Sequence, residues 1–200
     1  MRIGATVVAV IVSLPLGLVA VRAVAITAGQ FFDPCLQWGN GGKSFSGTIR
    51  PGDPCKAQSG TSETKAQAAA RMLIVPGGIL AGLALGILGA ARGRAGLAVG
   101  GAVVVFLESV PLVFSFGPLA VLTSGAFLLL ARNAGPLRGA ARIVARVLGA
   151  VSAIMGLNAL RLVAAMVNEP GWIMLLLQMT FLFFVSGAAW WPDVRRATAG

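Results

Sequence analysis

The sequence predicts an all-α integral membrane protein with six transmembrane helices and a disulfide-stapled outer loop between the first and the second. Of its 200 residues 57% are hydrophobic and 11% are charged, whereas about 25% of a soluble domain is charged. Long apolar stretches alternate with short clusters of arginine, which fall on every second connection. Because cytoplasmic connections collect Lys and Arg, this pattern predicts orientation as well as class.

The first predicted span covers residues 3–28. Arg2 before an apolar run is also typical of a signal peptide, and Ala23-Val24-Ala25 resembles a cleavage site. The apolar run is longer than the core of a usual signal peptide. We therefore expect an uncleaved transmembrane helix.

Residues 29–70 form the one long polar segment, which is the predicted outer loop. Cys35 and Cys55 both follow an Asp-Pro pair, so each thiol comes directly after a rigid corner. Two cysteines in one polar loop of a membrane protein favour a structural disulfide in an oxidising compartment. A redox-active pair is the alternative, but catalytic dithiols are typically Cys-x-x-Cys.

The outer loop is also rich in large apolar side chains. Phe31, Phe32, Trp38 and Phe45 lie in or beside it. They form either a small core over the helix ends or a contact surface for another protein. A short stapled loop buries little apolar surface by itself, so we favour a partner-contact surface.

The second predicted span, residues 71–91, carries a stripe of glycines. Gly78, Gly82 and Gly86 repeat every four residues, and such stripes let membrane helices approach closely. Only residues 92–95 separate this span from the next, which predicts that the two helices are antiparallel neighbours.

Residues 96–131 are too long for one ordinary crossing, since about 20 residues suffice. They form either a hairpin or one long broken helix. Pro111 and Gly117-Pro118 interrupt the middle, and a single crossing would place the next arginines outside, against the orientation rule. We favour two short spans, residues 96–114 and 116–131.

A basic cytoplasmic connection is predicted over residues 132–146. Arg138, Arg142 and Arg146 recur every four residues and would share one face of a helix. They indicate either lipid headgroup binding by an interfacial helix or an ordinary positive loop that runs into the next span.

The last predicted spans are residues 147–167 and 172–190, and Trp190-Trp191 is a predicted interfacial anchor. Six spans place both termini on one side. Nine basic residues fall on that side and five on the other, so we expect cytoplasmic termini and the cysteine loop outside. The excess of Arg over Lys, with abundant Ala, Gly and Val, indicates a GC-rich bacterial genome, so the expected location is a bacterial plasma membrane.

Ionisable groups inside spans are costly and mark sites by default. Arg22, Glu108 and Arg161 each lie about six residues from the outer end of a predicted span, roughly 9 Å deep. Gln178 lies at the same depth and Asn158 one turn deeper. This intramembrane polar layer predicts an ion pair of Glu108 with Arg161 or Arg22. It serves either to fix helix register or to bind an anion, lipid headgroup or polar substrate.

Composition argues against several chemistries. The chain has no His and two Cys, so neither imidazole-based catalysis nor a metal site with four thiolates is expected. We predict no catalytic residue, no metal and no cofactor. The net charge of +10 would suggest nucleic acid in a soluble protein, but basic connections explain it here, and membrane lipids are the expected partners.

Two functions are favoured on the sequence alone, and a membrane enzyme that would use Glu108 or the acids of the loop is the weakest third. The first is a structural or accessory subunit of a bacterial plasma-membrane assembly, which contacts other membrane subunits through the outer loop and the small-residue helix faces. The second is a small transporter or a lipid- or anion-binding protein that uses the polar layer.

Overall fold

Six helices make up the part of the chain that a computed structural model describes, which is residues 3–32, 65–110, 117–168 and 171–197. They are α1 (Ile3–Phe32), α2 (Lys65–Arg92), α3 (Ala95–Ser109), α4 (Gly117–Ala134), α5 (Gly139–Ala165) and α6 (Trp172–Ala197). The predicted all-α class with six helices is confirmed. The predicted disulfide between Cys35 and Cys55, and the loop residues Trp38 and Phe45, lie outside the described residues.

Four of these helices are long and apolar enough to cross a membrane: Ile3–Ala28, Leu73–Arg92, Gly139–Ala165 and Trp172–Trp191. Many of their large apolar side chains are exposed, with Ile11 at 59%, Ile154 at 59% and Leu177 at 47%. Soluble monomers rarely expose contiguous apolar surface of this extent. The helices therefore support the prediction of a multi-pass membrane protein.

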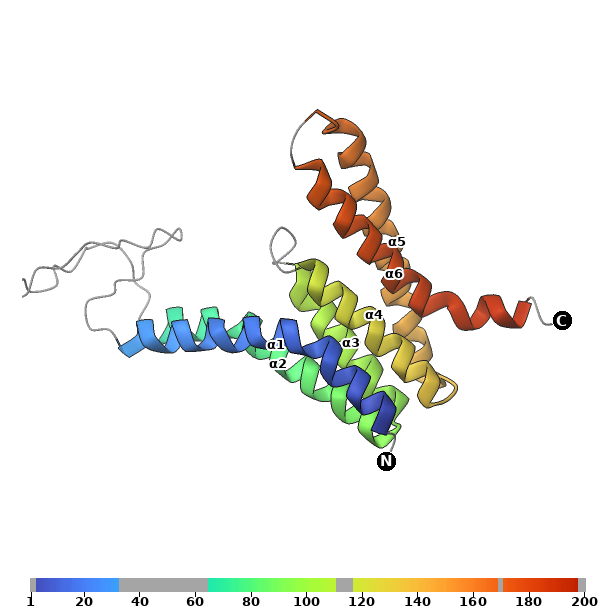
Figure 1. The fold of residues 1–200 in the computed structure, drawn as a ribbon, viewed down its shortest axis with the longest axis horizontal. Coiled ribbons are helices and arrows are strands. Elements are labelled where there is room, and N and C mark those ends of the chain that lie inside the picture. Colours follow the sequence, from blue (N-terminus) through green and yellow to red (C-terminus); the bar gives the residue numbers. More distant parts are fainter. Residues whose placement is uncertain (1–2, 33–64, 111–116, 169–170, 198–200) are drawn as a thin grey trace, which may run out of the picture. The chain divides into compact units, whose positions relative to one another are not determined.

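The chain divides into two compact units. The first contains Met1–Leu18 and Gly78–Gly200, and the second contains Val19–Gly77. In the second unit, the later half of α1 and the earlier half of α2 lie side by side (Figure 1). The Thr27 hydroxyl there donates a hydrogen bond to the carbonyl oxygen of Ala23 at 2.9 Å, so this polar group is satisfied within its own helix.

In the first unit, α2 and α3 pack as antiparallel neighbours, as their short connection predicts. Gly93 has a φ of 64°, a left-handed conformation that favours glycine. It ends α2 and lets the Arg94 N–H donate to the Gly89 carbonyl oxygen at 2.9 Å. The chain then reverses into α3.

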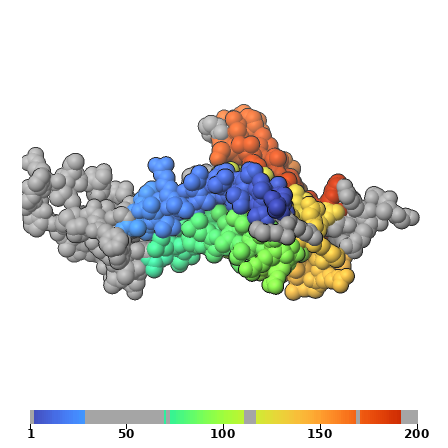
Figure 2. All heavy atoms as spheres, turned by 60° about the horizontal axis from the view of Figure 1, so that its bottom comes forward, coloured from blue at the N-terminus to red at the C-terminus, as the bar shows by residue number. Residues whose placement is uncertain are grey.

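The helices α3 and α4 lie side by side (Figure 1) and form the centre of the first unit. Ala98, Ala102, Val105, Ala120 and Phe127 are completely buried. The first half of α1 covers one side of the unit: Figure 2 shows its dark blue atoms over α2 in green, where Gly17 faces Leu83. Figure 1 shows that α5 and α6 form a second hairpin, with α6 packed on α4.

Residues 96–131 are thus two helices and not one continuous helix. The helix α3 has 15 residues, or about 22 Å at 1.5 Å per residue. The helix α4 has 18 residues, or about 27 Å. Both fall short of the roughly 30 Å hydrocarbon core. Among the described helices, α3 and α4 are therefore the two that are not long and apolar enough to cross a membrane by themselves.

The basic connection differs most from its predicted bounds. The helix α4 continues to Ala134 and α5 begins at Gly139, so the segment that links them is shorter than residues 132–146. Arg138 is the extended residue before α5, and Arg142 and Arg146 lie inside the helix. Arg and Ala favour helix strongly, and Pro136 stands before the first turn, where it interrupts nothing.

Candidate functional site

Hydroxyl groups account for most of the buried polar side chains, and helix backbones satisfy them. Ser13 donates to the Ala9 carbonyl oxygen at 2.6 Å and Ser152 to that of Leu148 at 2.7 Å, each within its own helix. Ser124 of α4 instead donates to the Ala102 carbonyl oxygen of α3 at 2.7 Å. This polar pair joins two helices at the centre of the unit.

Thr123 links α4 to the first half of α1. Its hydroxyl lies 2.9 Å from the Leu119 carbonyl oxygen and 3.3 Å from that of Val12, and the side chain is 2% exposed. Buried hydroxyls that bond to a backbone carbonyl avoid the cost of an unsatisfied polar group in an apolar surrounding. These groups act in helix packing.

Glu108 is the single carboxylate among the side chains that the structure describes. It is half-buried on α3, and its carboxylate faces Gly78 of α2. A Cβ added at Gly78 would overlap the carboxylate oxygen and lie 2.6 Å from the Glu108 Cδ. A glycine at this position therefore makes room for the carboxylate beside the backbone of α2.

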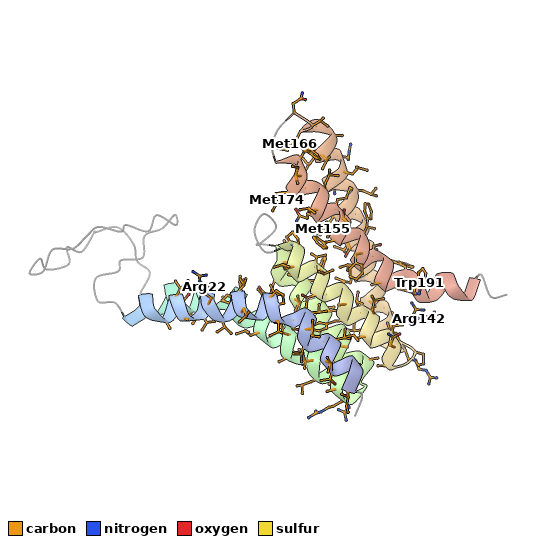
Figure 3. All side chains as sticks on the ribbon, in the orientation of Figure 1. Arg22, Arg142, Met155, Met166, Met174 and Trp191 are labelled. Atoms are coloured by element: carbon orange, nitrogen blue, oxygen red, sulfur yellow. The ribbon has the colours of Figure 1, made fainter. Side chains whose placement is uncertain are left out.

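The other residues of the predicted polar layer do not gather around Glu108 but lie on other helices. Arg161 and Asn158 are exposed on α5, and Gln178 is 6% exposed on α6. Within the described part of the chain, Glu108 forms no ion pair with Arg161. Its carboxylate points at α2, whereas Arg161 stands on the outer face of α5. Arg22 is exposed on α1 in the second unit, and Figure 3 shows its side chain projecting from the helix.

Gly82 and Gly86 lie on the same face of α2 as Gly78. A Cβ at Gly82 would meet the Val105 side chain at 2.8 Å, and one at Gly86 would overlap the Phe127 ring of α4. Across the interface, a Cβ at Gly101 would lie 2.5 Å from the Gly86 nitrogen and 2.7 Å from the Gly82 carbonyl oxygen. The backbones of α2 and α3 are thus in direct contact at this point.

Sequence reasoning missed a second small-residue seam. The buried face of α5 carries Ala145, Gly149, Ser152, Gly156 and Ala159, and α6 covers it. A Cβ at Gly149 would lie 2.6 Å from the Ala189 Cβ, and one at Gly156 would lie 3.2 Å from the Phe183 ring. These small residues recur every three or four positions, and this spacing, which predicts one close-packed helix face, is visible in the sequence.

Arginine and tryptophan meet at one end of the α5–α6 pair. The Arg146 guanidinium carbon lies 5.8 Å from the centre of the Trp190 ring, within cation–π range. Figure 3 shows Arg142 and Trp191 at this same end, while Met166 and Met174 mark the opposite end. Arg and Trp are the side chains that anchor helices at a membrane surface.

No protein-family model, no curated protein and no solved structure matches the chain. Within the described residues, no group of three or more His, Cys, Asp or Glu side chains has a metal-binding arrangement.

Proposed function

We propose that the chain is a structural or accessory subunit of a bacterial plasma-membrane protein assembly. The observation that carries this proposal is the interior of the first unit, where glycine backbones touch and where the Ser124 and Thr123 hydroxyls bond to carbonyl groups of neighbouring helices. These glycines and hydroxyl groups serve the packing of helices against one another. Such an interior suits a scaffold that presents its outer faces to other subunits.

The proposed topology has all six helices in the bilayer, with both termini cytoplasmic and the cysteine loop outside. Four helices have the length for a crossing, and the α3–α4 hairpin crosses twice as a protein-covered centre. The cation–π pair of Arg146 and Trp190 would then lie at the cytoplasmic surface, where Arg138 and Arg142 reach anionic lipid headgroups. The aromatic side chains Phe31, Phe32, Trp38 and Phe45 belong to the proposed outer contact surface.

Purification from native membranes in mild detergent tests this function. Native mass spectrometry should find the chain in a complex with other membrane subunits at fixed stoichiometry. Trp38→Ser should reduce the bound fraction, while the neighbouring control Gln37→Ala should not. A chain that is recovered only by itself or only with its own copies would contradict the proposal.

One observation favours a second function, that of a small transporter, over the alternative of an anion- or lipid-binding protein. Glu108 holds its carboxylate against the α2 backbone, with no ion pair to Arg161. A carboxylate attracts cations and repels phosphate, so if Glu108 serves a ligand, a monovalent cation such as Na⁺ should raise the melting temperature of the wild type and not that of Glu108→Gln. Equal responses of the two proteins would remove this second function.

A further inference from the structure

The outer face of α5 carries a stripe of exposed residues. Val147, Val151, Ile154, Asn158 and Arg161 follow one another at spacings of four and three residues, and all five are exposed. This spacing is the repeat of a helix that packs along another helix. The opposite face of α5 is the small-residue seam that α6 already covers. The helix therefore packs on α6 through one face, and the stripe on the opposite face is exposed.

Both polar residues of the stripe lie within the length that a bilayer core would cover. In the proposed topology, the cation–π pair of Arg146 and Trp190 marks the surface end of α5. Asn158 is then about 18 Å and Arg161 about 22 Å farther along the helix, inside a core of about 30 Å. Polar groups at that depth are costly when they face lipid.

Contact with lipid does not remove the free-energy cost of both polar side chains. The long Arg161 side chain reaches toward the nearer headgroups, but an Asn side chain is too short to do so. Within the described residues, the Asn158 side chain forms no hydrogen bond and Arg161 forms no ion pair. A protein partner that satisfies both groups would remove the cost and bury the three β-branched residues of the same stripe.

We propose that this stripe binds a transmembrane helix of another subunit that carries an Asp or Glu at the depth of Arg161. The carboxylate would pair with the guanidinium, and Asn158 would hydrogen-bond to the same helix one turn away. The charge of Arg161 makes the choice of partner specific, because Arg pairs with carboxylates in a bidentate geometry.

A second copy of this chain is a poor occupant of the stripe. Two copies in one membrane pack α5 against α5 in parallel around a twofold axis, which brings the two Arg161 side chains together. Like charges in a medium of low dielectric repel strongly. Glu108 supplies no carboxylate to this face, because it is on α3 and faces Gly78.

This inference rests on the proposed accessory function and names the chemistry of the partner. The test uses the full chain in phosphatidylcholine vesicles and a labelled polyleucine transmembrane peptide with one Glu four residues from an end. Energy transfer should report that this peptide associates about threefold to thirtyfold more tightly than the all-Leu peptide, the range for polar contacts between membrane helices. Arg161→Leu should abolish the difference. The control Thr180→Leu, on the exposed face of α6, should preserve it.

A charge exchange keeps the test informative if Arg161→Leu disturbs the fold. Arg161→Glu should reject the Glu peptide and accept a peptide with Lys at the same position. Equal affinity for the Glu and all-Leu peptides would overturn the proposal. Loss of the difference in affinity on addition of phosphatidylglycerol would also overturn the proposal, because it would assign Arg161 to lipid. Association between copies of the chain that depends on Asn158 would overturn it as well.

The two proposals fail in different ways. Subunits that co-purify equally well with wild type and with Arg161→Leu would leave the accessory function standing and overturn the role of this stripe. A chain that selects the Glu peptide but recovers no subunit from native membranes would contradict the accessory function alone.

Discussion

At the scale of single residues, the glycines of α2 and α3 show which side chains are excluded by contact and which positions are open. Gly101 lies against the backbone of Gly86, whereas nothing lies within 4 Å of a Cβ at its neighbour Gly100. Backbone atoms cannot rotate away as a side chain can. The two positions therefore form a matched pair for substitution.

We expect Gly101→Ala to lower the free energy of unfolding by about 1–3 kcal/mol, the usual cost of an overpacked interior. Gly100→Ala should be neutral or stabilising by about 0.5–1 kcal/mol, because alanine favours helix more than glycine does. Thermal unfolding of both variants in the same detergent measures the difference. Equal melting temperatures would mean that α2 and α3 are not in backbone contact.

Gly78 presents a softer contact, since its neighbour is the end of the Glu108 side chain. Gly78→Ala should displace the carboxylate and destabilise by about 1 kcal/mol, less than an overlap with backbone. In a Glu108→Ala background, Gly78→Ala should lower the free energy of unfolding only slightly. A double-mutant cycle should therefore give a coupling energy between positions 78 and 108. If the effects of the two substitutions on stability were additive, the Glu108 carboxylate would not be in contact with Gly78.

At the scale of helices, hydroxyl groups of α4 form hydrogen bonds to other helices, and other hydroxyl groups form them only within their own helix. The two kinds of hydrogen bond should contribute differently to stability. Ser124→Ala removes the hydrogen bond to Ala102 of α3 and should cost about 0.6–2 kcal/mol, as found for polar links between membrane helices. Thr180→Ala removes only a bond to Leu176 within α6 and is the control. Chemical unfolding in mixed micelles compares the two, and a larger effect of Thr180→Ala would contradict this assignment.

A second prediction at this scale concerns the contact of Arg146 of α5 with Trp190 of α6. Trp190→Leu should destabilise by roughly 0.5–1 kcal/mol through loss of the cation–π contact with Arg146. Arg146→Ala should also destabilise, and the double variant should cost less than the sum of the two single variants. Melting curves of the three variants test this, and an additive double variant would show that the two side chains act separately.

Much of this architecture is readable in the sequence, and the reasons are local. The helix breaks at Gly93 and before Gly117, and the glycine stripe of α2, follow from turn chemistry and spacing. The sequence predicts a membrane span from residue 147, whereas the helix α5 itself begins at Gly139, because Arg and Ala favour helix beyond the apolar stretch as well. The partner of Glu108 depends on which face α3 turns toward α2, and counting residues from span ends gives depth but not rotation.

At the scale of the whole molecule, we propose that all six helices cross a membrane with both termini on the cytoplasmic side. The shortness of α3 and α4 makes their hairpin the decisive element. If the hairpin crosses twice, residues 111–116 lie at the outer surface and residues 135–138 at the inner one. If it enters and leaves by the same side, the sidedness of every later helix changes.

The most direct test is labelling of single cysteines in intact cells with a membrane-impermeant maleimide. The background is Cys35→Ser with Cys55→Ser, and the probes are Ser46→Cys, Ser115→Cys, Leu137→Cys and Ala199→Cys. We expect the probes at 46 and 115 to be labelled in intact cells, and those at 137 and 199 only after the membrane is opened. Labelling of 137 in intact cells, or protection of 115, would contradict the six-span account.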